Sequence, residues 1–133
     1  MASPVPFGDV PPTAPLRLAA TDIGDGQVVL MVTGEVDMAT CDQLDQTVAH
    51  LLRRRPRRLL LDLAGVRFLD SSGIRVLLHS GRRAQQQDCH LSLVNTPPAV
   101  RRVLEIAGVA SLLGLDVDRD DQTEAVSSPD STR

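Results

Sequence analysis

One short segment gathers most of the groups that could do chemistry. Residues 69–74 read Leu-Asp-Ser-Ser-Gly-Ile, so a carboxylate, two hydroxyls and a glycine stand in a row where an apolar run gives way to a helical pattern. A helix start exposes unpaired N–H groups and a partial positive charge, which accommodate an anion such as a phosphate. Gly73 has no side chain, so another protein's backbone or a nucleotide could approach closely. The structural alternative is that Asp70 or Ser71 simply caps the helix.

A second acidic segment is expected beside the first. Gly34-Glu35-Val36-Asp37 breaks an earlier β-branched run. If the two strands are parallel, both segments leave the sheet at its carboxyl edge, where open α/β sheets place their binding sites. The sequence therefore predicts that Asp37 and Asp70 converge, although Asp37 taken alone could equally be an ordinary turn residue.

Catalytic roles for these groups fit poorly. The nucleophile elbow of hydrolases requires Gly-x-Ser-x-Gly, and the first glycine is missing here. His79 lies about 10 Å beyond Ser72 along the expected helix, too far to activate its hydroxyl. The chain has no nucleotide-binding fingerprint, and Cys41 and Cys89 are too few and too far apart for a zinc site or a disulfide framework. We expect a chain without enzymatic activity, metal or cofactor, with a small serine hydrolase using Ser72 as a remote alternative.

Alternating strands and helices would position these groups. Strands are expected over 16–22, 28–32, 59–63, 90–95 and, weakly, 112–117. Helices are expected from a cap at Thr40 to near Pro56, from the Ser72 segment to about Gln87, from Pro97 onwards, and over 121–127. The first two strands form a hairpin across Gly24-Asp25-Gly26, and the later alternation implies a largely parallel sheet. The predicted fold class is α/β, with a mixed, mostly parallel sheet, an N-terminal hairpin and flanking helices.

Apolar patterning predicts the buried faces of these elements. The near-continuous run Leu59–Leu63 is typical of a strand buried on both faces, with Leu60 and Leu61 on opposite sides. Helical spacing predicts the buried positions of the first two helices. They are Cys41, Leu44, Val48, Leu51 and Leu52 in the first, and Ile74, Leu77, Leu78, Gly81 and Ala84 in the second.

Length and composition limit the classes of partner. The 133 residues suit one domain, which we place at 16–126, between a proline-rich disordered leader at 1–15 and a disordered tail at 127–133. The net charge is −3, and the acidic C-terminal stretch carries most of it. A near-neutral body with two aromatic residues argues against direct nucleic-acid binding. The arginines at 53–58 are interpreted as a solvated helix end. With no signal peptide or apolar span, a cytoplasmic protein without a membrane partner is expected.

Taken together, these motifs resemble the STAS family of anti-sigma factor antagonists over roughly residues 16–126. The resemblance rests on Gly34-Glu35-Val36-Asp37, Leu61-Asp62-Leu63-Ala64-Gly65-Val66, Phe68-Leu69-Asp70-Ser71-Ser72-Gly73 and Val103-Leu104-Glu105-Ile106-Ala107-Gly108-Val109. It implies a STAS fold and a binding switch in which the second serine of the motif, Ser72, is phosphorylated by the anti-sigma factor, an ATP-binding serine kinase. The dephosphorylated form would bind that kinase and free the sigma factor. A PP2C-type phosphatase would reset the cycle.

The resemblance also implies where partners would bind. The expected contact residues surround Ser72 and are Asp37, Met38, Asp70, Ser71, Gly73 and Arg75. The alternative within the same fold is a STAS scaffold or accessory subunit, of stressosome or lipid-transport type, that uses this surface without regulated phosphorylation.

Overall fold

The structure is a computed structural model that describes residues 16–110. Its elements are β1 (Arg17–Gly24), β2 (Gln27–Val36), α1 (Cys41–Leu52), β3 (Arg58–Leu69), α2 (Ser71–Gln86), β4 (His90–Val94) and α3 (Pro98–Ile106). This order confirms the expected alternation up to α3. The leader at 1–15, the strand at 112–117, the helix at 121–127 and the tail at 127–133 lie outside the described residues.

The four strands form one mixed sheet in the order β1-β2-β3-β4. β1 is antiparallel to β2, whereas β2, β3 and β4 are parallel to one another. The hairpin turns where the sequence predicted it, through three residues with positive φ: Gly24 at 90°, Asp25 at 54° and Gly26 at 74°. Glycine adopts these angles without a steric penalty, which explains its place on both sides of Asp25.

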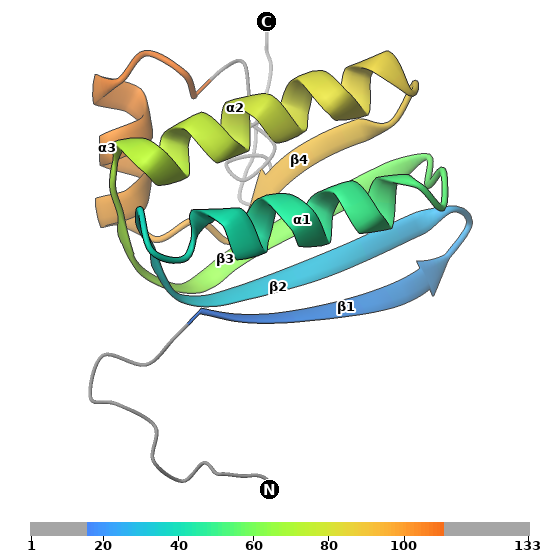
Figure 1. Cartoon of the computed structure of the whole chain (residues 1–133), viewed down its shortest axis with the longest axis horizontal. Helices are drawn as coiled ribbons and strands as arrows, with labels where there is room; N and C mark the ends of the chain where they lie inside the picture. The colour runs from blue at the N-terminus through green and yellow to red at the C-terminus, as the bar shows by residue number, and fades with distance from the viewer. Residues whose placement is uncertain (1–15, 111–133) are drawn as a thin grey trace, which may run out of the picture.

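Two helices cover one face of the sheet (Figure 1). α1 and α2 lie side by side over it, each beginning at the carboxyl end of a strand, and α3 stands at that same end of the sheet (Figure 1). The core between the layers is aliphatic; its fully buried members include Leu30, Val32, Leu44, Val48, Leu59, Leu61, Leu77 and Leu93. None of the helices within residues 16–110 is both long and apolar enough to cross a membrane.

β2 runs further than the sequence predicted. Gly34 does not break the strand: Glu35 and Val36 still pair with Phe68 and Leu69 of β3. A register shift falls between Gly34 and Glu35, and Gly34 has a φ of 112°, an angle that glycine tolerates. The extra residue at this shift, Arg67, lies in β3, so β2 continues without interruption toward the Asp37 segment.

The two faces of β3 are buried to different degrees. Leu61 is 0% exposed on the face that packs against the helices. Leu60, on the other face, is partly buried, so both leucines are covered as expected and Leu61 is covered more completely. The reason is that both α1 and α2 lie on the same side of β3 (Figure 1).

The buried face of α2 differs in part from the predicted one. Leu77 and Ala84 are buried as expected, but Ile74, Leu78 and Gly81 are only partly buried. The remaining buried positions of the helix are Ser72, Gly73, Val76 and Ser80. α2 packs against α1 as well as the sheet, so small polar residues enter its buried face. In α1, Leu44, Val48, Leu51 and Leu52 are buried as predicted, and Cys41 is partly buried.

Candidate functional site

Asp70 forms the cap between β3 and α2. Its Oδ1 accepts the backbone N–H of Ser72 at 2.8 Å and that of Gly73 at 3.1 Å. Asp70 itself has an extended backbone, with φ −105° and ψ −170°, as is usual for a helix N-cap. The predicted cap is thereby confirmed and assigned to Asp70. Two N–H groups of the first turn, which have no acceptor within the helix, therefore already donate to a carboxylate.

Asp37 plays a similar part before α1. Its Oδ1 accepts the N–H of Ala39 at 2.9 Å and that of Thr40 at 3.1 Å. Thr40 occupies the N-cap position, but its side chain makes no cap hydrogen bond; its hydroxyl donates instead to the carbonyl of Glu35 at 2.8 Å. The expected capping by the Thr40 side chain is therefore wrong, because that hydroxyl ties the turn back to the end of β2.

The two acidic segments meet as predicted. The N–H of Asp70 donates to the carbonyl of Val36 at 3.2 Å, which joins the ends of β2 and β3. Gly73 is buried against this junction: a Cβ there would lie 2.5 Å from Leu69 Cδ1 and 3.0 Å from the Val36 carbonyl oxygen. The close approach that Gly73 permits is thus to the chain's own strands. Its expected role in admitting a partner's backbone or a nucleotide stays a prediction.

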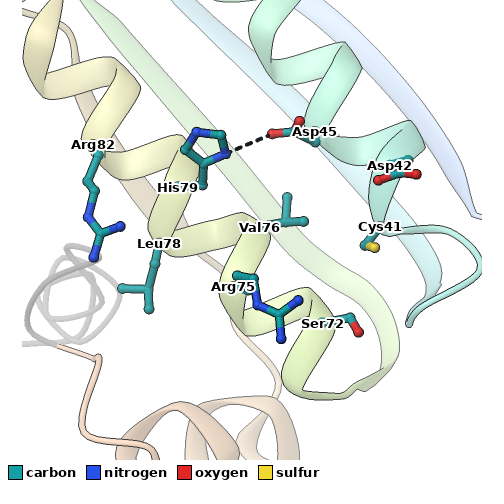
Figure 2. Close-up of a pocket in the computed structure, with 9 residues that line it drawn as sticks. All are labelled: Cys41, Asp42, Asp45, Ser72, Arg75, Val76, Leu78, His79 and Arg82. Atoms are coloured by element: carbon teal, nitrogen blue, oxygen red, sulfur yellow. Dashed lines mark ion pairs between the residues drawn. The ribbon is translucent and has the colours of Figure 1, made fainter.

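Ser72 faces a groove between α1 and α2 (Figure 2). The groove has a volume of about 420 Å³. Ser72 is 9% exposed and lies at its edge, whereas Ser71, the preceding residue, is exposed to solvent. The lining residues are Cys41, Asp42 and Asp45 from α1 and Ser72, Arg75, Val76, Leu78, His79 and Arg82 from α2.

Charges line the two walls of the groove. On the α1 wall, Asp45 lies 3.5 Å from Nδ1 of His79 and 3.6 Å from a guanidinium nitrogen of Arg83, so polar contacts that include an Asp45–Arg83 ion pair link the two helices. On the α2 wall, Arg75 is exposed and has no carboxylate within ion-pair distance among residues 16–110. Figure 2 shows its side chain extending toward the end of α2 that carries Ser72.

The predicted site residues fall into two groups. Asp37, Asp70 and Gly73 are held in internal contacts of the carboxyl edge. The others are open to solvent: Met38 is 79% exposed, and Ser71 and Arg75 are exposed as well. The second group is therefore accessible at this edge, and the role of both groups in partner binding stays a prediction.

Sequence reasoning missed most of the groove. Val76, His79 and Arg82 follow Ser72 by four, seven and ten residues, which is the spacing of one helical face. That signal was present in the sequence. On the α1 wall, Cys41 and Asp42 precede Asp45 by four and three residues, which is again the spacing of one face, but only the packing of α1 against α2 shows that this face lines the groove.

Both cysteines are free thiols. Cys41 begins α1 at the carboxyl edge, and Cys89 precedes β4 at the opposite edge, so the chain topology separates them by the length of a strand. Burial raises the pKa of the Cys89 thiol, and a hydrogen bond with the backbone of Leu59 partly offsets the rise. Within residues 16–110, no group of three or more His, Cys, Asp and Glu side chains is placed to hold a metal ion.

Comparison with known proteins gives matches over most of the chain. The model of a protein family described as "Mlab, STAS domain" matches residues 19–114. The chain is also 31% identical over 88 residues to the Bordetella bronchiseptica protein named "Putative anti-sigma factor antagonist BtrV". That match covers 66% of this chain and 76% of BtrV.

Solved structures agree with this match. An anti-sigma factor antagonist from Mycobacterium paratuberculosis superposes with a TM-score of 0.69 at 27% identity, covering 83% of this chain and 98% of that one. The Bacillus cell fate determinant SpoIIAA, in its phosphorylated form, gives a TM-score of 0.59 at 20% identity, covering 72% and 87% of the two chains. The likeness to SpoIIAA is one of fold.

Proposed function

Because the chain belongs to the STAS family of anti-sigma factor antagonists, we propose that it binds an anti-sigma factor at the carboxyl edge of its sheet and that phosphorylation of Ser72 controls this binding. The partner is an anti-sigma factor with serine kinase activity. The unmodified chain sequesters it and so releases a sigma factor for transcription. A PP2C-type phosphatase restores the unmodified state, and the exchange takes place in the cytoplasm, with the chain acting as a binding module and not as an enzyme.

The placement of Ser72 carries this proposal. Its hydroxyl lies in the first turn of α2 and borders the groove between α1 and α2. A partner that covers the exposed Met38, Ser71 and Arg75 also covers this hydroxyl. Two of the relatives, BtrV and the Mycobacterium paratuberculosis protein, are named as anti-sigma factor antagonists, and SpoIIAA has been solved in a phosphorylated form.

Phosphorylation would change this surface chemically without reshaping the domain. It adds about −1.5 to −2 charges and three acceptor oxygens at neutral pH. Asp70 already places a carboxylate beside Ser72, so a partner fitted to a neutral hydroxyl meets bulk and unpaired negative charge. A loss of about 3 kcal/mol of binding free energy weakens a complex more than a hundredfold, which suffices for a switch.

Neighbouring serines provide a matched pair of variants to test the proposal. The full chain and its Ser72→Ala and Ser71→Ala variants would be incubated with ATP and serine kinases of the anti-sigma factor class, and phosphate incorporation read by intact mass. We expect wild type and Ser71→Ala to gain one phosphate and Ser72→Ala to gain none. Modification of Ser71 alone would contradict the proposal.

Binding of the same kinase gives the second half of the test. Ser72→Ala should bind it as tightly as the unmodified chain, and Ser72→Asp at least about a hundredfold more weakly while keeping its circular dichroism spectrum. If Ser72→Asp binds as tightly as wild type, the switch is wrong. A chain that no such kinase modifies or binds would instead support the scaffold or accessory-subunit alternative.

A further inference from the structure

We propose that Arg75 binds the phosphate of phosphorylated Ser72 across one turn of α2. The Arg75 guanidinium can contact a partner before Ser72 is phosphorylated, and it is engaged by the phosphate afterwards. This inference rests on the proposed phosphorylation of Ser72. It assigns to Arg75 a regulatory role inside the chain in addition to any contact with a partner.

The start of α2 cannot neutralise the phosphate unaided. The N–H groups of Ser72 and Gly73, which a phosphate would otherwise use, already donate to Asp70 at 2.8 and 3.1 Å. The capping group is itself a carboxylate. A phosphate on Ser72 therefore enters a neighbourhood of like charge, and it needs a cation to offset that repulsion.

Arg75 is placed to supply that cation. Residues three apart on a helix have Cβ atoms about 5–6 Å apart, and helical side chains lean toward the N-terminus of the helix, so Arg75 leans toward Ser72. Both residues line the same groove, and Figure 2 shows the Arg75 guanidinium on the Ser72 side of its backbone. A guanidinium binds phosphate oxygens through two parallel N–H groups, which favours this pairing.

The other cations of the groove are less suitable. His79 follows Ser72 by about 10 Å along the helix and is engaged with Asp45. Arg82 follows it by about 15 Å. Arg75 has no carboxylate within ion-pair distance among residues 16–110, so no such contact has to break. Arg82 lines the same groove and is likewise exposed, which makes it the matched control.

The test measures the phosphate directly. Phosphoserine would be installed at position 72 of the full chain during translation, and its second ionisation followed by phosphorus NMR in wild type, Arg75→Gln and Arg82→Gln. A nearby guanidinium favours the dianion and lowers this pKa. Arg75→Gln should therefore raise it by about 0.5 to 1 unit, while Arg82→Gln stays close to wild type. In about 1 M salt the difference should shrink, since exposed charges are screened there.

Three results would overturn the proposed contact between Arg75 and the phosphate. They are an Arg75→Gln value equal to wild type, an equal rise in Arg82→Gln, and a difference that persists undiminished in high salt. None of these depends on a kinase, because the phosphoserine is introduced by translation. Failure of this contact is thus distinct from failure of the proposed function, which would show as absence of kinase modification at Ser72.

Discussion

At the scale of single residues, the carboxylate of Asp70 has two effects. It anchors the first turn of α2 through the N–H groups of Ser72 and Gly73. It also makes the surroundings of Ser72 acidic before any modification. The same residue therefore stabilises the fold and increases the electrostatic effect of adding a phosphate nearby.

Replacing Asp70 tests the first effect, the stabilisation of the start of α2. Asp70→Ala removes the cap and should lower the free energy of unfolding by about 1–2 kcal/mol, as measured by urea denaturation. Asp70→Asn keeps a side-chain oxygen that can accept the same N–H groups and should lose much less. If the two variants are equally destabilised, the negative charge and not the cap hydrogen bonds stabilises the helix start.

At the scale of elements, β3 supports the site because it runs without a break from the core to Asp70. Leu61 is fully buried beneath the helices, and Leu60 points to the less covered face. Leu61→Ala should lower the free energy of unfolding by about 2–5 kcal/mol, since it leaves a cavity in a closed core. Leu60→Ala is the matched control and should cost clearly less in the same urea denaturation. Equal costs would mean that both faces of β3 are closed.

The same strand shows how far its sequence could be interpreted. The run Leu59–Leu63 predicts a strand because its apolar residues are continuous. The continuation to Leu69 was not predicted, because two register shifts against β2 add a residue to β3 each time. They change the spacing of buried residues from two to three, as in Leu63, Val66 and Leu69. Bulges of this kind depend on the partner strand and leave no period in the sequence.

The candidate site was predictable where local chemistry determined it. The cap at Asp70 and the meeting of the two acidic segments follow from residue type and from parallel strands. The burial of Ser72, the packing role of Gly73 and the α1 wall of the groove were not foreseen. They arise from the distance at which α2 packs against α1 and the ends of β2 and β3, which is a tertiary property.

At the scale of the whole molecule, positive charge at the end opposite the site is partly structural. Arg57 donates two hydrogen bonds to the carbonyl of Asp25, at 3.0 and 2.6 Å, and so braces the β1–β2 turn. Arg53 lies 3.2 Å from Nδ1 of His50 at the end of α1. These contacts agree with the interpretation of the arginine cluster as a solvated helix end, and the absence of nucleic-acid binding stays a prediction.

The composition of the whole chain makes the titration of one thiol, that of Cys89, easier to observe. The sequence has no lysine and no tyrosine, so neither of these residue types can mask the titration of the Cys89 thiol at alkaline pH. Because burial raises the pKa of Cys89, the folded state holds this proton more tightly than the unfolded state. Stability is fully present below the usual thiol pKa and falls as pH rises toward the folded value.

Urea unfolding at several pH values from 8 to 11 would check this titration. Wild type should lose stability progressively on the alkaline side, and Cys89→Ala should show no such loss, whatever its stability at pH 8. Cys41→Ala retains Cys89 and should keep the decline. An alkaline decline that survives in Cys89→Ala would assign the effect to another group.

The near burial of Ser72 has a consequence for how a modifying enzyme recognises its substrate. The hydroxyl sits in the first turn of a packed helix, with the N–H of its own residue bonded to Asp70, so it cannot be drawn into an active site as an extended peptide without disrupting the end of α2. A short segment cut from this region would be a marginal helix in water and would lack both the groove and the opposing α1 wall. If Ser72 is phosphorylated as proposed, we therefore expect the kinase to recognise the folded domain and not a linear sequence motif. Unfolded chains would then be neither phosphorylated by the kinase nor able to bind it.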